Sequence, residues 1–164
     1  MEVYKQLPEG TLAELIEGTI YMSPSPIRSH QRIVSILSSK MILFTEDTKA
    51  GEVYVAPFDV YLDEHLNAVQ PDIVFVSTAR LSIISQHIHG VPDLVVEVLS
   101  EGNESHDRIR KKNLYERFGV KEYWIINPET KEVTGYFHDN NQYKELDKTV
   151  GKITSRVLNH TFEF

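Results

Sequence analysis

The chain of 164 residues contains no cysteine. Disulfide bonds, thiolate zinc sites and a cysteine nucleophile are therefore excluded. Any metal would have to be bound by oxygen or imidazole ligands, and carboxylate-bound Mg²⁺ or Mn²⁺ is the cofactor that such a donor set favours.

Long apolar runs are also missing. None approaches the roughly 20 residues that a helix needs to span a bilayer, and residues 1–5 have neither the basic nor the apolar region of a signal peptide. We therefore expect a soluble, cytoplasmic protein with no membrane partner. With 41% hydrophobic residues, the chain is expected to form a single domain over residues 1–164.

Positive charge is in deficit, because 17 lysine and arginine residues face 24 acidic ones and the net charge is -7. This balance argues against a general nucleic-acid coat protein, since counterion release needs clustered basic residues. A nuclease is still allowed, because the acidic residues can gather in a metal site or on a distant surface. One local basic segment remains, and a solvated helix face explains it equally well. It consists of Arg108, Arg110, Lys111, Lys112, Arg117 and Lys121.

Hydrophobic periodicity in the first half predicts strands around one long helix. Residues 12–22 predict two short strands around a Glu-Gly turn, and apolar residues at helical spacing predict a helix over 29–45. Residues 53–62 favour a strand in which Pro57 marks an edge or a bulge. A turn over 63–67 then predicts a hairpin with the strand that contains Asp72.

The second half predicts a β-helix-β unit. Residues 93–100 are apolar at nearly every step, which indicates a central strand buried on both faces. A helix over 106–118, ended by Gly119, leads to a strand over 121–126, and this order favours a right-handed parallel crossover. Residues 133–164 predict a β-rich C-terminal extension. The expected fold class is α/β, a mixed sheet flanked by helices.

Two acids interrupt apolar strand-like runs. Asp72 lies in the run 70–76 and Glu97 in the run 92–100. A charge in a buried strand is costly unless it is paired or binds a cation, so these two acids indicate a divalent metal site. Strand alternation places Asp93 about 13 Å from Glu97 on the same face, too far to share one ion. Asp93 follows Pro92 and is more typical of a turn or cap, whereas Glu97 lies at the strand end where ligands usually bind.

The following helix carries a lysine on its inner face. If Leu114, Tyr115 and Phe118 point inward, Lys111 lies within roughly 20° of that direction and Asp107 within roughly 30°, whereas Lys112 lies roughly 110° away. Lys111 must therefore find a carboxylate, which Glu97 or Asp72 would supply. A lysine beside a two-acid metal site is suited to phosphodiester cleavage, and a purely structural buried ion pair is the alternative.

A series of short motifs over residues 10–130 resembles the Uma-two family. That family belongs to the restriction-endonuclease-like superfamily, which is known by its PD-(D/E)XK signature. The resemblance rests on residues 14–18, 22–26, His30, 57–60, 70–73, 92–100, Asp107, Lys111, Tyr115 and 122–128.

The resemblance implies a restriction-endonuclease-like core with a metal-dependent nuclease site. Asp72 matches the first acid of the signature and Glu97 the second, and together they would hold Mg²⁺ or Mn²⁺. The signature then requires a lysine two residues further on, where this chain has Leu99. Lys111 takes that role through a shifted pattern, and would orient the attacking water or stabilise charge on the phosphate.

Three accessory residues complete the expected site. Glu14 would complete the metal shell through water, and Asp107 lies on the inner helix face. His30 would contact phosphate or transfer a proton, but a polar residue at a helix start is an equally good interpretation.

Tyr115 and Trp124 are more typical of core aromatics than of base-stacking residues. His87 and His89 lack an obvious third ligand and indicate a surface loop.

The leading functional hypothesis is a metal-dependent DNA endonuclease or nickase. One rival is a non-catalytic nucleic-acid-binding or regulatory module. A second is a small phosphate-handling enzyme or a dimeric scaffold with a vestigial site. Double-strand cleavage by one site per chain would favour a homodimer, for which residues 157–164 offer an apolar segment. The chain has no helix-turn-helix or zinc finger from which DNA specificity can be inferred.

Overall fold

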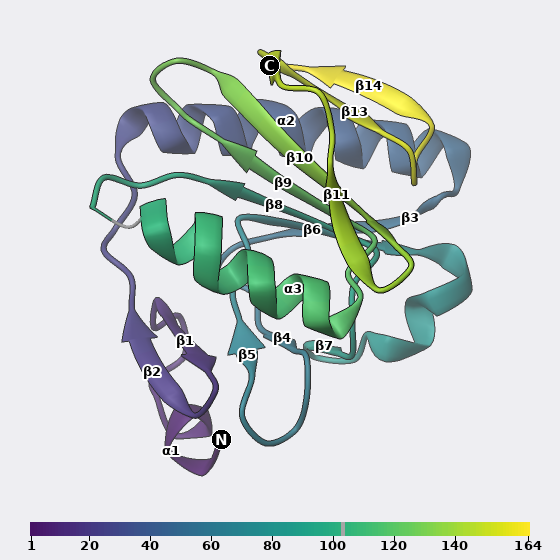
Figure 1. Cartoon of the computed structure of the whole chain (residues 1–164). Coiled ribbons are helices and arrows are strands. Elements are labelled where there is room, and N and C mark those ends of the chain that lie inside the picture. Colours follow the sequence, from purple (N-terminus) through teal and green to yellow (C-terminus); the bar gives the residue numbers. More distant parts are fainter. Residues whose placement is uncertain (103) are drawn as a thin grey trace.

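A mixed β-sheet forms the centre of the molecule (Figure 1). The computed structural model describes residues 1–102 and 104–164. The strand order is β11-β10-β9-β8-β6-β3, and a further short strand, β12, pairs with β10. Their bounds are β3 (Gly51–Val55), β6 (Ile73–Ser77), β8 (Leu94–Val98), β9 (Glu122–Ile126), β10 (Glu132–Asp139), β11 (Gln142–Glu145) and β12 (Thr149–Val150).

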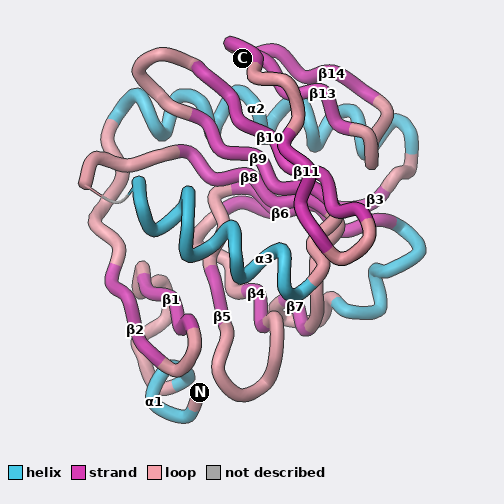
Figure 2. Tube along the Cα trace, viewed as in Figure 1, coloured by secondary structure: helices cyan, strands magenta, loops and turns pink. Residues whose placement is uncertain are grey.

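Helices cover both faces of this sheet, as Figure 2 shows by colour. The long helix α2 (Arg28–Thr48) covers one face together with the hairpin of β13 (Lys152–Ser155) and β14 (His160–Glu163). The π-helix η2 (His106–Lys111) continues into α3 (Lys112–Phe118) on the other face. The mixed α/β fold predicted from the sequence is therefore confirmed.

Strand β8 is central and buried on both faces, as its apolar sequence predicts. Its alternating side chains divide between the two cores: Val96 packs toward α2, and Val95 packs toward α3. Strand β9 runs parallel to β8, so the predicted parallel crossover is confirmed. The crossover helix ends where expected, because Gly119 adopts a φ of 80° that favours glycine and donates its N–H to the Tyr115 carbonyl.

A second, smaller sheet lies beside the first and includes the predicted N-terminal hairpin (Figure 1). The short helix α1 (Glu2–Lys5) packs on it through the buried side chain of Tyr4. Its strand order is β2-β1-β5-β4-β7, with bounds β1 (Ala13–Ile16), β2 (Thr19–Met22), β4 (Val60–Tyr61), β5 (Ala68–Val69) and β7 (Ile88–His89).

The single strand predicted over residues 53–62 is wrong, because the chain divides at Pro57 into strands of two sheets. Strand β3 pairs antiparallel with β6 in the large sheet, whereas β4 pairs with β5 in the small one. Proline lacks the N–H that a ladder requires, and the Ala56–Pro57 bond is cis. The turn over 63–67 therefore closes the β4-β5 hairpin, and residues 68–72 then lead the chain back to the large sheet.

The C-terminal segment packs against its own chain. Glu122 is fully buried, and its Oε1 accepts the backbone N–H groups of Arg156 and Val157 at 2.5 and 2.7 Å. Leu158 and Phe162 are buried in the core beneath α2. The apolar side chains that suggested a dimer contact over residues 157–164 are thus largely used within the chain. Over the described residues, no helix combines the length and apolarity needed to cross a bilayer.

Asp93 has the structural role that its position before the strand predicts. Its fully buried carboxylate accepts the Ser77 N–H at 2.8 Å and pairs with Lys121 at 2.7 Å and Arg80 at 3.5 Å. Burial opposes its ionisation, but Lys121 and the Ser77 hydrogen bonds outweigh burial and lower the pKa of Asp93 below its usual 3.8. Asp93 thereby ties the start of β8 to the end of β6 and to the residue before β9.

We expect Asp93→Asn to lower the free energy of unfolding at pH 7 by about 1–3 kcal/mol, because the charge-assisted hydrogen bonds are lost. A lowered folded-state pKa contributes stability that is fully present above the unfolded value of 3.8 and is lost as pH falls from there through the folded-state pKa. The difference between variant and wild type should therefore shrink from pH 7 toward pH 3 in urea titrations. A difference that stays constant over this range would contradict an ionic role for Asp93.

Candidate active site

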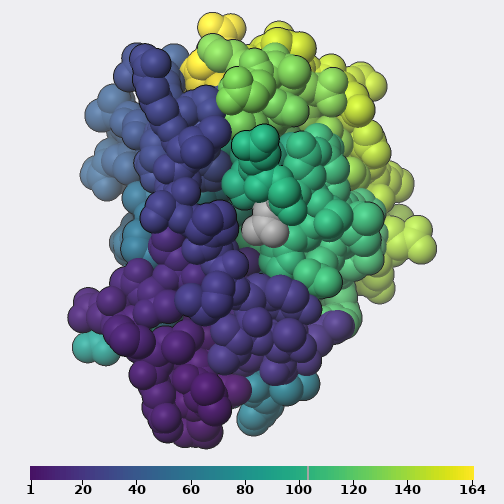
Figure 3. Space-filling model, turned by 90° about the vertical axis from the view of Figure 1, so that its left-hand side faces the viewer, coloured from purple at the N-terminus to yellow at the C-terminus, as the bar shows by residue number. Residues whose placement is uncertain are grey.

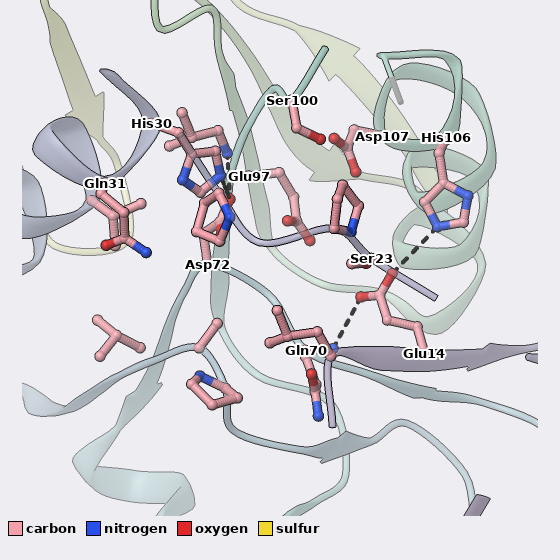
Figure 4. A pocket seen from close by; sticks show the side chains of 18 of the residues that line it. Glu14, Ser23, His30, Gln31, Gln70, Asp72, Glu97, Ser100, His106 and Asp107 are labelled. Atoms are coloured by element: carbon pink, nitrogen blue, oxygen red, sulfur yellow. Dashed lines mark hydrogen bonds and ion pairs between the residues drawn. The ribbon is translucent and has the colours of Figure 1, made fainter. Parts of the chain in front are cut away.

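A cavity of about 250 Å³ opens between the first turns of α2, the start of β1 and the π-helix η2. Figure 3 views a face on which the dark-blue segment leading into α2 lies beside the green segment that carries η2. Figure 4 shows the polar side chains of the cavity, which converge from these elements and from the ends of β6 and β8. Five of the six candidate residues, namely Glu14, His30, Asp72, Glu97 and Asp107, are labelled there; all six, including Lys111, line the cavity.

The ammonium group of Lys111 lies among three carboxylates. Its Nζ is 2.8 Å from Glu14 Oε1, 2.9 Å from Glu97 Oε1 and 3.6 Å from Asp107 Oδ1. All four side chains are at most 10% exposed. Lys111 is buried as the helix angles predict, whereas Lys112 is half-buried and does not line the cavity, with its Nζ 5.1 Å from the centre of the Tyr136 ring.

The π-helix brings His106 into this cluster, a contact that regular helical periodicity does not predict. His106 Nε2 lies 3.3 Å from Glu14 Oε2, and Arg110 Nη1 donates to His106 Nδ1 at 2.7 Å. At 100° per residue, His106 would lie roughly 140° from Lys111. In a π-helix the hydrogen bonds run from i to i+5, so the fifth residue returns to nearly the same side. His106 and Lys111 therefore both reach Glu14.

Asp72 and His30 form the second part of the site. Asp72 precedes β6, and its Oδ2 accepts the Val98 N–H at 2.7 Å and lies 3.2 Å from His30 Nε2. Burial disfavours the charged imidazole, but the hydrogen bond and charge of Asp72 outweigh burial and raise the pKa of His30. The buried Nδ1 of His30 has no partner among the described residues. His30 thus contacts a candidate metal ligand, which a merely polar helix start would not require.

Tyr115 combines two roles. Its ring is fully buried in the core, as expected, and its hydroxyl donates to Glu97 Oε1 at 3.0 Å. The hydrogen bond was not predicted, although the spacing of four residues from Lys111 places both side chains on one helix face. Trp124 lies on the opposite face of the sheet, in the core beneath α2, where its indole N–H donates to Glu122.

The cavity is lined by more acidic than basic side chains. Burial opposes ionisation of Glu14, but Lys111 and hydrogen bonds from His106, Lys111 and Gln70 lower its pKa to about 2. Burial and neighbouring acids outweigh Lys111 at Glu97 and raise the pKa of that carboxyl well above its usual value. Asp107 shifts in the same direction for the same reasons. Glu14 is therefore the main counterion of Lys111, and Glu97 carries its charge at a cost.

Lys111 itself remains a cation. Burial favours the neutral amine, but the charges of Glu14, Glu97 and Asp107 outweigh it and raise the pKa of Lys111 well above its usual value. A lysine in this state can stabilise negative charge or donate hydrogen bonds, and it is unsuited to act as a base.

The donor chemistry of the cavity fits a hard divalent cation. The hydrogen bonds of Asp72 and Glu97 use Oδ2 and Oε1, leaving the second oxygen of each carboxylate for a further ligand. A dication would also offset the excess negative charge. No three His, Asp or Glu side chains of the described chain already converge in metal-binding geometry. In this arrangement the cation among the carboxylates is Lys111.

The basic segment predicted from the sequence does not form one continuous surface. Lys121 pairs with Asp93, Arg117 pairs with Glu17 on the small sheet, and Arg110 stacks 4.4 Å from the centre of the Tyr21 ring. Lys111 is inside the cavity. These four basic residues therefore contact partners on separate parts of the fold.

The two histidines expected in a surface loop are separated as well, and the expectation is wrong for His89, which belongs to strand β7. His89 Nδ1 lies 2.7 Å from Glu64 Oε1 and its ring stacks on Tyr61, whereas His87 lines a second cavity. The two side chains therefore do not share a ligand site.

The sequence matches one family model over residues 1–159, and the description of that model reads "Uma2: Putative restriction endonuclease". Among solved structures, the chain is similar to a protein from Anabaena variabilis ATCC 29413 that is described as a "putative nuclease belonging to DUF820". The TM-score is 0.77 at 19% identity, over 96% of this chain and 89% of that one. At this identity the likeness shows the shared fold. No curated protein matches the chain.

The family match spans nearly the whole sequence, including every candidate site residue, and agrees with the resemblance inferred from the motifs. The chain therefore belongs to the Uma2 (Uma-two) family.

Proposed function

We propose that this protein is a Mg²⁺- or Mn²⁺-dependent endonuclease or nickase that hydrolyses phosphodiester bonds in DNA. One observation carries the proposal: Asp72, Glu97 and Lys111 line a single cavity in which acidic groups outnumber basic ones. Membership of a family described as restriction endonucleases supports the same reaction class.

Asp72 and Glu97 are the residues that would hold the metal. When bound, a divalent cation would supply the Lewis acidity that polarises a scissile phosphate and makes a water acidic near neutral pH. Tyr115 fixes Glu97 Oε1 by a hydrogen bond, and the Val98 N–H fixes Asp72 Oδ2. These contacts orient the unused oxygen of each carboxylate, as outer hydrogen bonds do for metal ligands in general.

Lys111 acts as a fixed positive charge in this proposal. Its raised pKa keeps it protonated, and a protonated lysine can both stabilise charge on the phosphate and orient the attacking water as a hydrogen-bond donor. Glu14 holds the ammonium in place at 2.8 Å and is itself held by His106 and by the Gln70 N–H. Glu14 is thus a positioning residue, and Asp107 lends further negative charge around Lys111.

The cytoplasmic location and the homodimer expected from the sequence belong to the same proposal. One site per chain cuts one strand, so cutting both strands would require two copies related by a two-fold axis. In the segment 157–164, Leu158 and Phe162 are buried beneath α2, whereas residues 159–161 and Glu163 are exposed.

The first test is nicking of supercoiled plasmid in Mg²⁺ or Mn²⁺. Lys111→Met should lower the rate roughly 100- to 1000-fold, because a preorganised charge at the reacting phosphate is removed. Glu97→Gln should lower it at least as far. The matched controls are Lys112→Met, which alters the neighbouring lysine that does not line the cavity, and Asp93→Asn, which alters the structural acid before the same strand.

Full activity of Lys111→Met would assign the lysine to a purely structural ion pair. An inactive but folded wild type, on supercoiled and branched DNA alike, would favour the non-catalytic module. EDTA should abolish cleavage by the wild type.

Metal binding also predicts a change in stability that does not depend on activity. Mn²⁺ at about 100 times its Kd should stabilise the wild type by roughly 2–3 kcal/mol, since it binds the folded state. Asp72→Asn and Glu97→Gln should lose this stabilisation, and Asp93→Asn should retain it. Thermal unfolding with and without Mn²⁺ measures the effect. An equal Mn²⁺ response in all four proteins would place the metal elsewhere.

A further inference from the structure

A second cavity lies directly beside the candidate active site. Its volume is about 800 Å³, and its walls are α1 with residues 7–11, the segment 57–61 and the loop at residues 86–87. Pro57 and Gln70 line both cavities and so form a shared wall. A ligand that occupies one cavity is therefore a neighbour of a ligand in the other.

The walls of the second cavity combine aromatic rings with two acidic residues, Asp59 and Glu9, and with Lys5. Phe58, Tyr61 and Tyr4 line it, and the ring of His87 lies 5.9 Å from that of Phe58 and 5.8 Å from that of Tyr61. The buried Nδ1 of His87 has no hydrogen-bond partner among residues 1–102 and 104–164. Such a lining suits a flat, polar ring better than an aliphatic ligand.

Of these two acids, Asp59 accepts hydrogen bonds from neutral donors. Its Oδ1 accepts Tyr4 OH at 2.7 Å and Gln70 Nε2 at 2.9 Å. Within the part of the chain that the structure describes, its Oδ2 accepts only the longer Tyr61 OH contact, at 3.3 Å. Oδ2 thus retains acceptor capacity for a ligand that brings an N–H donor.

Gln70 connects this carboxylate to the active site. Its side chain donates to Asp59, while its backbone N–H donates to Glu14 Oε1 at 3.0 Å. Glu14 and Glu97 are each only 3% exposed, so a phosphate can reach them only by entering the first cavity. A DNA strand must leave the duplex to place its phosphate in the first cavity. The neighbouring base then becomes unstacked and needs a new stacking surface.

We propose that the second cavity binds one unstacked, amino-bearing nucleobase of the strand whose phosphate occupies the active site. The aromatic walls stack on the base and Asp59 Oδ2 accepts a hydrogen bond from its exocyclic amino group. This inference rests on the proposed nuclease function and specifies its substrate as an unpaired strand containing adenine, cytosine or guanine.

The test measures binding of short fluorescent DNA strands by anisotropy in EDTA, where no cleavage occurs. One strand carries a single adenine among abasic positions, the second has the unsubstituted purine that lacks the amino group, and the third is wholly abasic. The adenine strand should bind at least about fivefold more tightly than the abasic strand, the lower end of what one stacked base contributes. The purine strand should lie between them.

The matched variants are Gln86→Trp, which fills the cavity from its exposed rim, and Ser82→Trp, at an exposed position outside both cavities. Equal unfolding temperatures for the two variants would establish equal folding. Gln86→Trp should abolish the preference for adenine, and Ser82→Trp should keep it.

Equal affinity for all three strands, or an adenine preference that survives Gln86→Trp, would overturn the inference, as would no binding at all. If free deoxyadenosine binds as tightly as the strand, the cavity is a site for a free nucleoside, and the inference is overturned as well. A wild type that binds with this preference but never nicks plasmid would refute only the proposed hydrolysis, so the two failures are distinguishable.

Discussion

The buried ion cluster around Lys111 holds the two sheets and the crossover helix in register. Glu14 belongs to the small sheet, Glu97 to the large one and Lys111 to η2, and the ammonium group lies within 3 Å of both acids. Bringing three charges out of water is expensive, and the attraction repays that cost only when geometry and extra hydrogen bonds are good. Gln70, His106 and Tyr115 supply those hydrogen bonds.

In this cluster three acids share one lysine, whereas two cations share Asp93. Asp93 and Glu97 lie four residues apart, at the beginning and near the end of one buried strand segment. Asp93 has cations at its rim and a lowered pKa, whereas Glu97 shares its lysine with other acids and has a raised one. Apolar side chains of similar volume can often replace a buried ion cluster without loss of stability, so the proposed metal-dependent function would give a reason for keeping the second arrangement.

The sequence predicts most of the large sheet because its local signals are strong. The apolar run of β8, the glycine that ends α3 and the 3.6-residue periodicity of α2 each depend on nearby residues. The inward direction of Lys111 followed from the same periodicity. The division at Pro57 into two sheets was missed, since the choice between β6 and β5 as partner depends on tertiary packing rather than on β-propensity.

The missed contacts of the site have a common origin. His106 requires the wider turn of a π-helix, and no local residue pattern announces it. Arg117 finds its partner Glu17 one hundred residues earlier in the chain, so the apparent basic run could not be divided without knowing the topology. The sequence placed Asp59 in a motif but did not predict its hydrogen bonds, because its donors lie far away in the chain, in α1 and at Gln70.

Gln70 shows why the two cavities are best understood as one extended surface. Its backbone fixes Glu14 and its side chain fixes Asp59, so movement of either acid disturbs the other through a single residue. The acids on the two sides differ in their surroundings. Those near Lys111 form a charged cluster suited to a cation and a phosphate, while Asp59 has neutral donors and aromatic neighbours suited to a flat, uncharged ring. A nucleotide carries a phosphate next to a flat base. The two cavities on either side of the Gln70 wall offer these two chemistries at adjoining positions.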